Sequence, residues 1–175
     1  MLDSHPEVTG CEGFEFLVDL LGDNGNRPEV TAYHEYLRAH PIFRSSRLTI
    51  DDSLGFDALV NDFLHQRRSG SGKSQVAAMV HFGFSRIRHV WPEARYIHLI
   101  RDPRDVAPSV INMGWASTVW FALDRWIEAE AEWKELKPTL RDDQYIEIHF
   151  EDLIADHEMV LRLSLIHISE PTRPY

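Results

Sequence analysis

The sequence predicts an α/β fold in which helices cover a parallel sheet on both faces, giving three layers. Two short apolar runs rich in β-forming residues, Tyr96–Ile100 and Tyr145–Ile148, are separated by segments with a helical spacing of apolar residues. Strands that alternate with helices are typical of a parallel sheet. The chain has 175 residues, of which 43% are hydrophobic and five are tryptophan, enough for one domain with a buried core.

The first half of the chain is expected to contain one short extended segment, Val8–Cys11, and four helices. The helices are predicted from apolar residues that recur every three or four positions. They are Phe14–Leu21, Glu29–His40, Ile50–Gln66 and Val76–Trp91. A polar loop, Arg67–Gly72, is expected between the last two helices, and Pro92 ends the last one.

The second half of the chain carries the clearest strand signal, followed by strong helix signals. After the strand Tyr96–Ile100, Asp102 suits a helix N-cap and Pro103 suits the first helical turn. A long helix, closed by Pro138, follows. Its inward stripe is expected to consist of Trp120, Leu123, Trp126, Ile127, Trp133 and Leu136. The second strand then leads into a last helix that opens at Glu151.

The bulk composition excludes several classes of function. The formal net charge of −10 disfavours nucleic acid as a partner. Cys11 is the only cysteine and the ten histidines show no metal-ligand spacing, so neither a disulfide framework nor a metal site is expected. No apolar run approaches the ~20 residues of a membrane span, and no signal peptide opens the chain. These observations favour a cytoplasmic protein.

Cationic and hydroxyl side chains gather directly after the strand Tyr96–Ile100. Arg101 follows the last strand residue, and Ser109 lies eight positions later on the expected helix. Ligands of open α/β sheets bind at the carboxyl ends of strands, where arginine offers paired charged donors and serine offers a hydroxyl. Arg101, Arg104 and Ser109 therefore form a candidate phosphate site. The same residues also suit an ordinary capped strand–helix junction with surface ion pairs.

The segment Arg95–Ser109 resembles the 3′-phosphate-binding segment of the sulfotransferases that use 3′-phosphoadenosine 5′-phosphosulfate (PAPS). The resemblance implies that Arg101 and Ser109 hold the 3′-phosphate and that the fold is the P-loop NTPase-like sulfotransferase core. Three further segments are similar to the same family: Asn112–Trp115, His149–Ile154 and Leu2–Val8. The similarity is weak between about residues 25 and 70.

The resemblance implies an enzyme that moves a sulfuryl group from PAPS, its co-substrate, to a hydroxyl or amine of a small-molecule, carbohydrate or lipid acceptor. The family's phosphosulfate-binding loop lies just upstream of the segment that corresponds to Met1–Val8, and it is absent here. Residues from Leu163 onward resemble a translated sequencing adapter. We therefore expect a partial, inactive sulfotransferase domain at residues 1–162, truncated at both ends, and a non-native tail at residues 163–175.

Two side chains are candidates for the chemistry of the transfer. Glu12 stands where similar enzymes place a catalytic glutamate and is predicted to be the general base, with Glu15 as the alternative. Lys73 stands near the place where similar enzymes keep a lysine that stabilises the transferring group. Apart from the resemblance, Glu12 also suits a helix N-terminus, and Lys73 also suits a solvated loop.

The segment Ser69–Ser74 offers a competing hypothesis because it contains the Gly-Lys-Ser ending of the P-loop of ATP- and GTP-binding proteins. Arg67 stands where that loop needs a glycine, and the preceding residues continue a helical pattern instead of a strand. A nucleotide site at Gly72-Lys73-Ser74 and a non-catalytic α/β binding module are the two alternatives to a sulfotransferase.

Overall fold

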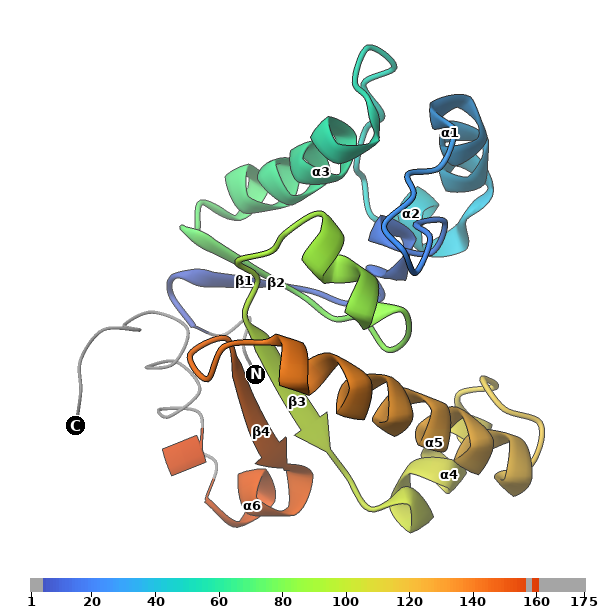
Figure 1. Cartoon of the computed structure of the whole chain (residues 1–175), viewed down its shortest axis with the longest axis vertical. Coiled ribbons are helices and arrows are strands. Elements are labelled where there is room, and N and C mark those ends of the chain that lie inside the picture. The colour runs from blue at the N-terminus through green and yellow to red at the C-terminus, as the bar shows by residue number, and fades with distance from the viewer. Residues whose placement is uncertain (1–4, 157–158, 161–175) are drawn as a thin grey trace. The chain divides into compact units, whose positions relative to one another are not determined.

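The structure of the protein, a computed structural model, describes residues 5–156 and 159–160. The chain divides into two compact units, Met1–Pro92 and Glu93–Tyr175. Among these described residues, each unit contains one two-stranded parallel sheet (Figure 1). The domain end predicted at Arg162 and the tail predicted at residues 163–175 lie outside the described residues.

The first unit is built around the strands β1 and β2, which the register aligns from Val8 opposite Gln75 to Cys11 opposite Ala78. Helix α3 contacts both strands and runs along them (Figure 1). In chain order, the elements of this unit are β1 (Val8–Cys11), η2 (Glu15–Leu17), α1 (Val30–Ala39), α2 (Pro41–Ser45), α3 (Phe56–Ser71), β2 (Gln75–Ala78) and η3 (Phe84–His89), where η is a 3₁₀ helix.

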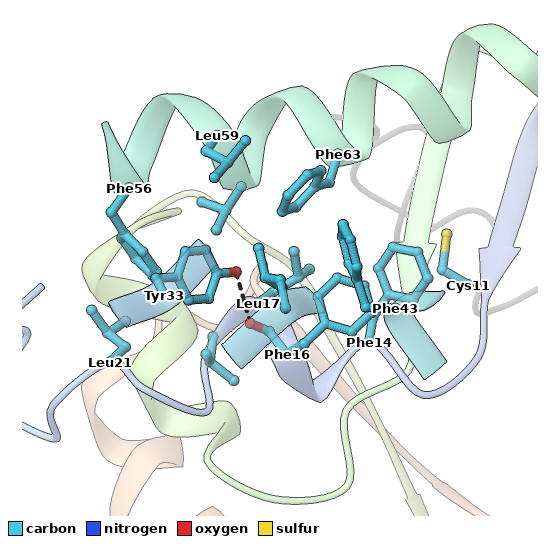
Figure 2. Close-up of a cluster of buried hydrophobic side chains, with 13 residues drawn as sticks. Cys11, Phe14, Phe16, Leu17, Leu21, Tyr33, Phe43, Phe56, Leu59 and Phe63 are labelled. Carbon is cyan, nitrogen blue, oxygen red and sulfur yellow. Dashed lines mark hydrogen bonds between the residues drawn. The ribbon is translucent and has the colours of Figure 1, made fainter. Parts of the chain in front are cut away.

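An aromatic core fills the first unit (Figure 2). Phe16 is fully buried, and its ring packs edge-on against Phe43 and Phe63, with 5.3 and 6.2 Å between the ring centroids. Tyr33 is also fully buried, and its hydroxyl donates a hydrogen bond to the carbonyl oxygen of Phe16 at 2.8 Å. The aromatic rings supply a large apolar area, and the one hydroxyl among them is satisfied.

The second unit is built around the strands β3 and β4, with β3 joined to β4 through two α-helices and a 3₁₀ helix. In chain order, its elements are β3 (Tyr96–Ile100), α4 (Pro103–Asn112), α5 (Val119–Leu136), η4 (Lys137–Thr139), β4 (Tyr145–His149) and α6 (Phe150–Ala155). Two small buried apolar clusters lie among its described residues: Ala107, Ala116 and Ala122 form one, and Ile148, Leu153 and Val160 form another.

Trp133 ties α5 to the strand pair β3–β4. Its ring contacts Tyr96 and His98 of β3 and Tyr145 of β4. Its indole N–H donates a hydrogen bond to the Glu147 carboxylate at 2.8 Å. Around Trp133, this unit therefore combines aromatic packing with a partly buried polar contact.

The structure confirms the predicted strands and most of the predicted helices. Val8–Cys11, Tyr96–Ile100 and the second strand form as expected, and so do α1, α4, α5 and α6. Asp102 is the N-cap of α4: its carboxylate accepts a hydrogen bond from the backbone N–H of Arg104 at 2.8 Å. The local signals at this junction, a capping aspartate and a proline in the first turn, are strong enough to decide its structure.

The helix predicted at Val76–Trp91 is wrong. Its first residues form the strand β2, and only Phe84–His89 are helical, as the 3₁₀ helix η3. Gly83, with φ of 67°, breaks the segment between the two. The alanines of β2 prefer a helix in isolation, but that preference is weak, and hydrogen-bonded pairing with β1 overrides it.

The predicted boundaries of two other helices are also wrong. Only Glu15–Leu17 of the segment Phe14–Leu21 is helical, as η2. Helix α3 begins at Phe56 instead of Ile50, because the Asp51 carboxylate accepts the backbone N–H of Ser53 and forms a turn. The helix then continues through the predicted loop Arg67–Gly72 as far as Ser71, and Gly72 ends it with φ of 71°.

Two expectations about packing are only partly met. Within α5, Trp133 and Leu136 are buried as predicted, but Trp120 and Ile127 are exposed, with 79% and 57% of their surface accessible. Within the described residues, the four strands form two separate parallel pairs, so the single three-layer sheet stays a prediction. None of the described helices combines the length and the apolar character that a membrane span requires.

Candidate functional site

The carboxyl end of the β3–β4 pair carries Arg101. The register places Ile100 opposite His149, so the residues that directly follow the two strands, Arg101 and Phe150, become neighbours. The guanidinium carbon of Arg101 lies 4.5 Å from the centroid of the Phe150 ring. Arg101 Nε is buried without a hydrogen-bond partner, and no described carboxylate of the second unit forms an ion pair with this arginine. Arg101 therefore presents a cation that no carboxylate of its own unit offsets.

Arg104 is engaged differently. Its guanidinium forms a paired contact with the Asp102 carboxylate, with Nε 2.9 Å from Oδ1 and Nη2 2.5 Å from Oδ2. The hydrogen bonds from the Arg104 side chain and backbone lower the pKa of Asp102 to about 2. The Arg104 side chain is 87% exposed. Asp102 therefore offsets much of the charge that Arg104 could offer to a ligand.

Ser109 lies on α4, seven residues after Asp102. At 3.6 residues per turn, this spacing places Ser109 on the same face of the helix as its N-cap. The side chain is half-buried, and none of the described residues hydrogen-bonds to its hydroxyl. The Ser109 hydroxyl is thus available as a hydrogen-bond donor on the same face of α4 as the N-cap residue Asp102.

The carboxyl end of the β1–β2 pair carries three titratable side chains. Glu12 directly follows β1 and is exposed, without a hydrogen bond or ion pair to a described residue. Glu15, at the start of η2, is only 17% exposed in its side chain. Its Oε1 lies 2.5 Å from His81 Nδ1 and accepts the backbone N–H of His81 at 3.1 Å. Glu15 and His81 therefore form a pair, which Glu12 does not join.

Opposing effects set the pKa of Glu15. Burial raises it, but the hydrogen bonds and the charge of His81, together with a backbone hydrogen bond from Glu15 itself, outweigh burial and leave the pKa below its usual value. Glu15 is therefore ionised at neutral pH and accepts hydrogen bonds only. It follows that His81 Nδ1 is the donor in this hydrogen bond.

Lys73 lies at the opposite end of the β1–β2 pair from Glu12 and Glu15. Its ammonium group donates a hydrogen bond to the carbonyl oxygen of Val8, the first residue of β1, at 3.0 Å. The structure thus brings Glu15 together with His81, and Arg101 together with Phe150, but it does not bring Lys73 to Glu12. His81 was not predicted as a site residue, because the segment around it was interpreted as a helix.

The order of elements around Gly72-Lys73-Ser74 excludes a P-loop at this place. A P-loop follows a strand and opens a helix. Here the segment follows the helix α3 and precedes the strand β2. In addition, no group of three or more histidine, cysteine or acidic side chains in the described part of the chain is arranged to hold a metal ion.

Comparisons with known proteins agree with the fold. A family model described as the sulfotransferase family matches residues 1–169, and no curated protein matches the chain. The structure is similar to the "Sulfotransferase Domain from the Curacin Biosynthetic Pathway", with a TM-score of 0.61 and 15% identity over 99% of this chain and 69% of that chain. It is also similar to the "Sulfotransferase Domain from the Synechococcus PCC 7002 Olefin Synthase", with a TM-score of 0.54 and 14% identity over 100% of this chain and 81% of that chain. These likenesses show the fold, and the family match over nearly the whole sequence shows that the chain belongs to the sulfotransferase family.

Proposed function

We propose that the chain binds the 3′-phosphate of PAPS through Arg101 and Ser109 and supports sulfuryl transfer to a hydroxyl or amine. The observation that carries this proposal is the state of Arg101. Its guanidinium lies at the carboxyl end of a parallel strand pair, stacks on Phe150 and has no carboxylate partner within the described part of its unit. A half-buried arginine of this kind favours an anionic ligand. Arg104 contributes less, because Asp102 engages it.

The proposed reaction is an in-line displacement at sulfur. The acceptor oxygen or nitrogen forms a bond to the sulfur while the bond between the sulfur and the 5′-phosphate oxygen breaks. The acceptor proton passes to a base, and adenosine 3′,5′-bisphosphate leaves with the electron pair of the broken bond. The acceptor is a small molecule, a carbohydrate or a lipid.

For the base, we propose the Glu15–His81 pair. His81 Nε2 takes the acceptor proton, and the Glu15 carboxylate, hydrogen-bonded to Nδ1, stabilises the imidazolium that forms. The side chain of His81 is 37% exposed and so accessible to a substrate. Glu12 remains the prediction made from the sequence, and it is tested beside the pair. A catalytic role for Lys73 also remains a prediction, and it requires the ammonium group to leave the Val8 carbonyl.

Titration calorimetry of the 175-residue chain with adenosine 3′,5′-bisphosphate tests the phosphate site. A charged hydrogen bond is worth ~1.5–3 kcal/mol, so Arg101→Ala is expected to weaken binding at least about tenfold. Equal affinities of the wild type and the variant would remove Arg101 from the site. If neither protein binds any nucleotide, also after the family's phosphosulfate-binding segment is added, the binding-module alternative gains support.

Turnover with PAPS tests the base, in a protein that carries the family's phosphosulfate-binding segment ahead of Met1. We expect His81→Gln to lower the transfer rate at least ~100-fold, the usual contribution of a general base, with donor affinity unchanged. The matched variant Glu12→Gln is expected to change the rate little. The opposite result, a large loss in Glu12→Gln alone, would assign the base to Glu12.

A further inference from the structure

Two segments of the second unit that are distant in sequence meet at the carboxyl end of the β3–β4 pair. The register sets Ile100 opposite His149. One residue further, Arg101 contacts Phe150. Two residues further, the backbone N–H of Asp102 donates a hydrogen bond to the Glu151 carboxylate at 3.1 Å. The contacts therefore follow the strand register step by step.

We propose that Phe150 and Glu151 form a platform that positions Arg101 for the 3′-phosphate of the donor nucleotide. This inference rests on the proposed function, in which Arg101 binds that phosphate. Phe150 and Glu151 are positioning residues because they act through Arg101 and Asp102.

The Phe150 ring holds the guanidinium without using its hydrogen-bond donors. A cation–π contact involves the face of the guanidinium plane, whereas the N–H groups point outward within that plane. With the guanidinium carbon 4.5 Å from the ring centroid, Arg101 is held in place while its outer N–H groups stay available to a phosphate. An acidic partner would also hold the arginine, but it would compete with the ligand for the same donors.

The ring is itself held by a small apolar cluster. Phe150 packs against the buried residues Ile148, Leu153 and Val160. These residues come from β4, from α6 and from the segment beyond α6. The position of the Arg101 guanidinium is therefore linked to the packing of α6 against β4.

Glu151 fixes the first residue of the loop after Arg101. Its carboxylate accepts the Asp102 N–H, and this hydrogen bond is the largest cause that lowers the pKa of Glu151. The Asp102 carboxylate in turn accepts a hydrogen bond from the backbone N–H of Arg104 at the N-terminus of α4 and forms an ion pair with the Arg104 side chain. The nearest acidic side chain along the chain is thus engaged by other groups, which leaves the charge of Arg101 to the ligand.

Calorimetry with adenosine 3′,5′-bisphosphate tests the Phe150 contact on the 175-residue chain. Phe150→Leu keeps apolar packing but removes the aromatic face, and we expect binding to weaken about two- to thirtyfold, the range of a cation–π interaction. Phe150→Tyr keeps the face and is expected to restore affinity to within about threefold of the wild type. Denaturant unfolding of each variant shows that it is folded at the assay temperature.

A double-mutant cycle separates positioning from direct ligand contact. If Phe150 acts through Arg101, the variant carrying both Arg101→Ala and Phe150→Leu binds no more weakly than Arg101→Ala alone. A further loss in the double variant overturns the platform, because Phe150 then contacts the nucleotide by itself. An Arg101→Ala loss together with wild-type affinity of Phe150→Leu also overturns the platform but leaves the proposed function intact. No loss in Arg101→Ala overturns the proposed function itself.

Glu151→Ala tests the second half of the platform at an exposed position where folding is little affected. Removal of a negative charge near a bound phosphate strengthens binding by electrostatics alone, whereas loss of positioning weakens it. We expect weaker binding. The matched control Glu135→Ala removes an exposed carboxylate on α5 that has no described partner, and it is expected to leave affinity unchanged or slightly increased. Unchanged or tighter binding of Glu151→Ala would exclude Glu151 from the platform.

Discussion

The carboxyl ends of the two strand pairs have the same backbone geometry but opposite chemistry. At the β1–β2 end, Glu15 and His81 form a hydrogen-bonded pair, and the neighbours of Glu15, Phe14 and Phe16, are buried in an aromatic core. At the β3–β4 end, Arg101 stacks on Phe150 above a small apolar cluster and has no carboxylate partner among the described residues of its unit. A paired acid and base suit proton transfer, and an unneutralised cation suits anion binding. The side chains that surround a strand end, more than the strand end itself, set its chemistry.

The largest effect is expected where the first unit depends on its core. Phe16→Ala removes a fully buried ring in contact with Phe43 and Phe63 and is expected to lower the free energy of unfolding by ~3–5 kcal/mol. Trp120→Ala, the matched change at an exposed aromatic residue of the second unit, is expected to change it by no more than ~0.5 kcal/mol. Guanidinium chloride unfolding measures both. If both variants lost the same free energy of unfolding, the buried ring of the first unit would contribute no more to stability than the exposed ring of the second unit.

A smaller effect is expected for the pair at the β1–β2 end. Glu15→Gln is expected to cost ~1 kcal/mol of stability at neutral pH, because the ionised acceptor of His81 is lost. The pKa of Glu15 is lowered by folding, so its stabilising effect is fully present above the ordinary value of 4.5 and is lost as the pH falls through its folded-state pKa.

Unfolding curves of the wild type and of Glu15→Gln, measured from neutral pH down to about pH 3, test this expectation. The two stabilities are expected to converge as the pH falls below 4.5. A difference that stays constant over the whole range would show that ionisation of Glu15 does not stabilise the fold. Glu12→Gln is the control, since Glu12 is exposed and forms no hydrogen bond or ion pair with a described residue.

The smallest effect is expected for Arg104, which sharpens the contrast with Arg101. Arg104→Ala removes an exposed side chain that is already engaged by Asp102. Exposed ion pairs contribute little, so we expect no measurable change in stability and a change in the affinity for adenosine 3′,5′-bisphosphate of less than about threefold. Calorimetry beside Arg101→Ala measures the difference. A loss as large as that of Arg101→Ala would show that Arg104 binds the phosphate directly.

Local signals in the sequence were sufficient to locate one of the two candidate sites. The strand Tyr96–Ile100, the cap at Asp102 and the arginine between them are adjacent in the chain, and their structure depends on short-range preferences. The Glu15–His81 pair could not be found in this way. The two residues are 66 positions apart, and His81 follows a strand whose alanines favour a helix when taken alone.

The sequence by itself determined the α/β character of the chain, the elements of its second half and the position of Arg101 after β3. These features depend on β-propensity, helix caps and prolines, which act within a few residues. Only the tertiary structure decided that Gln75–Ala78 is a strand, that His81 meets Glu15, that Lys73 lies at the far end of the pair, and that Phe150 supports Arg101. The physical reason is strand register: parallel pairing joins distant segments one residue at a time, and no local preference encodes which residues it brings together.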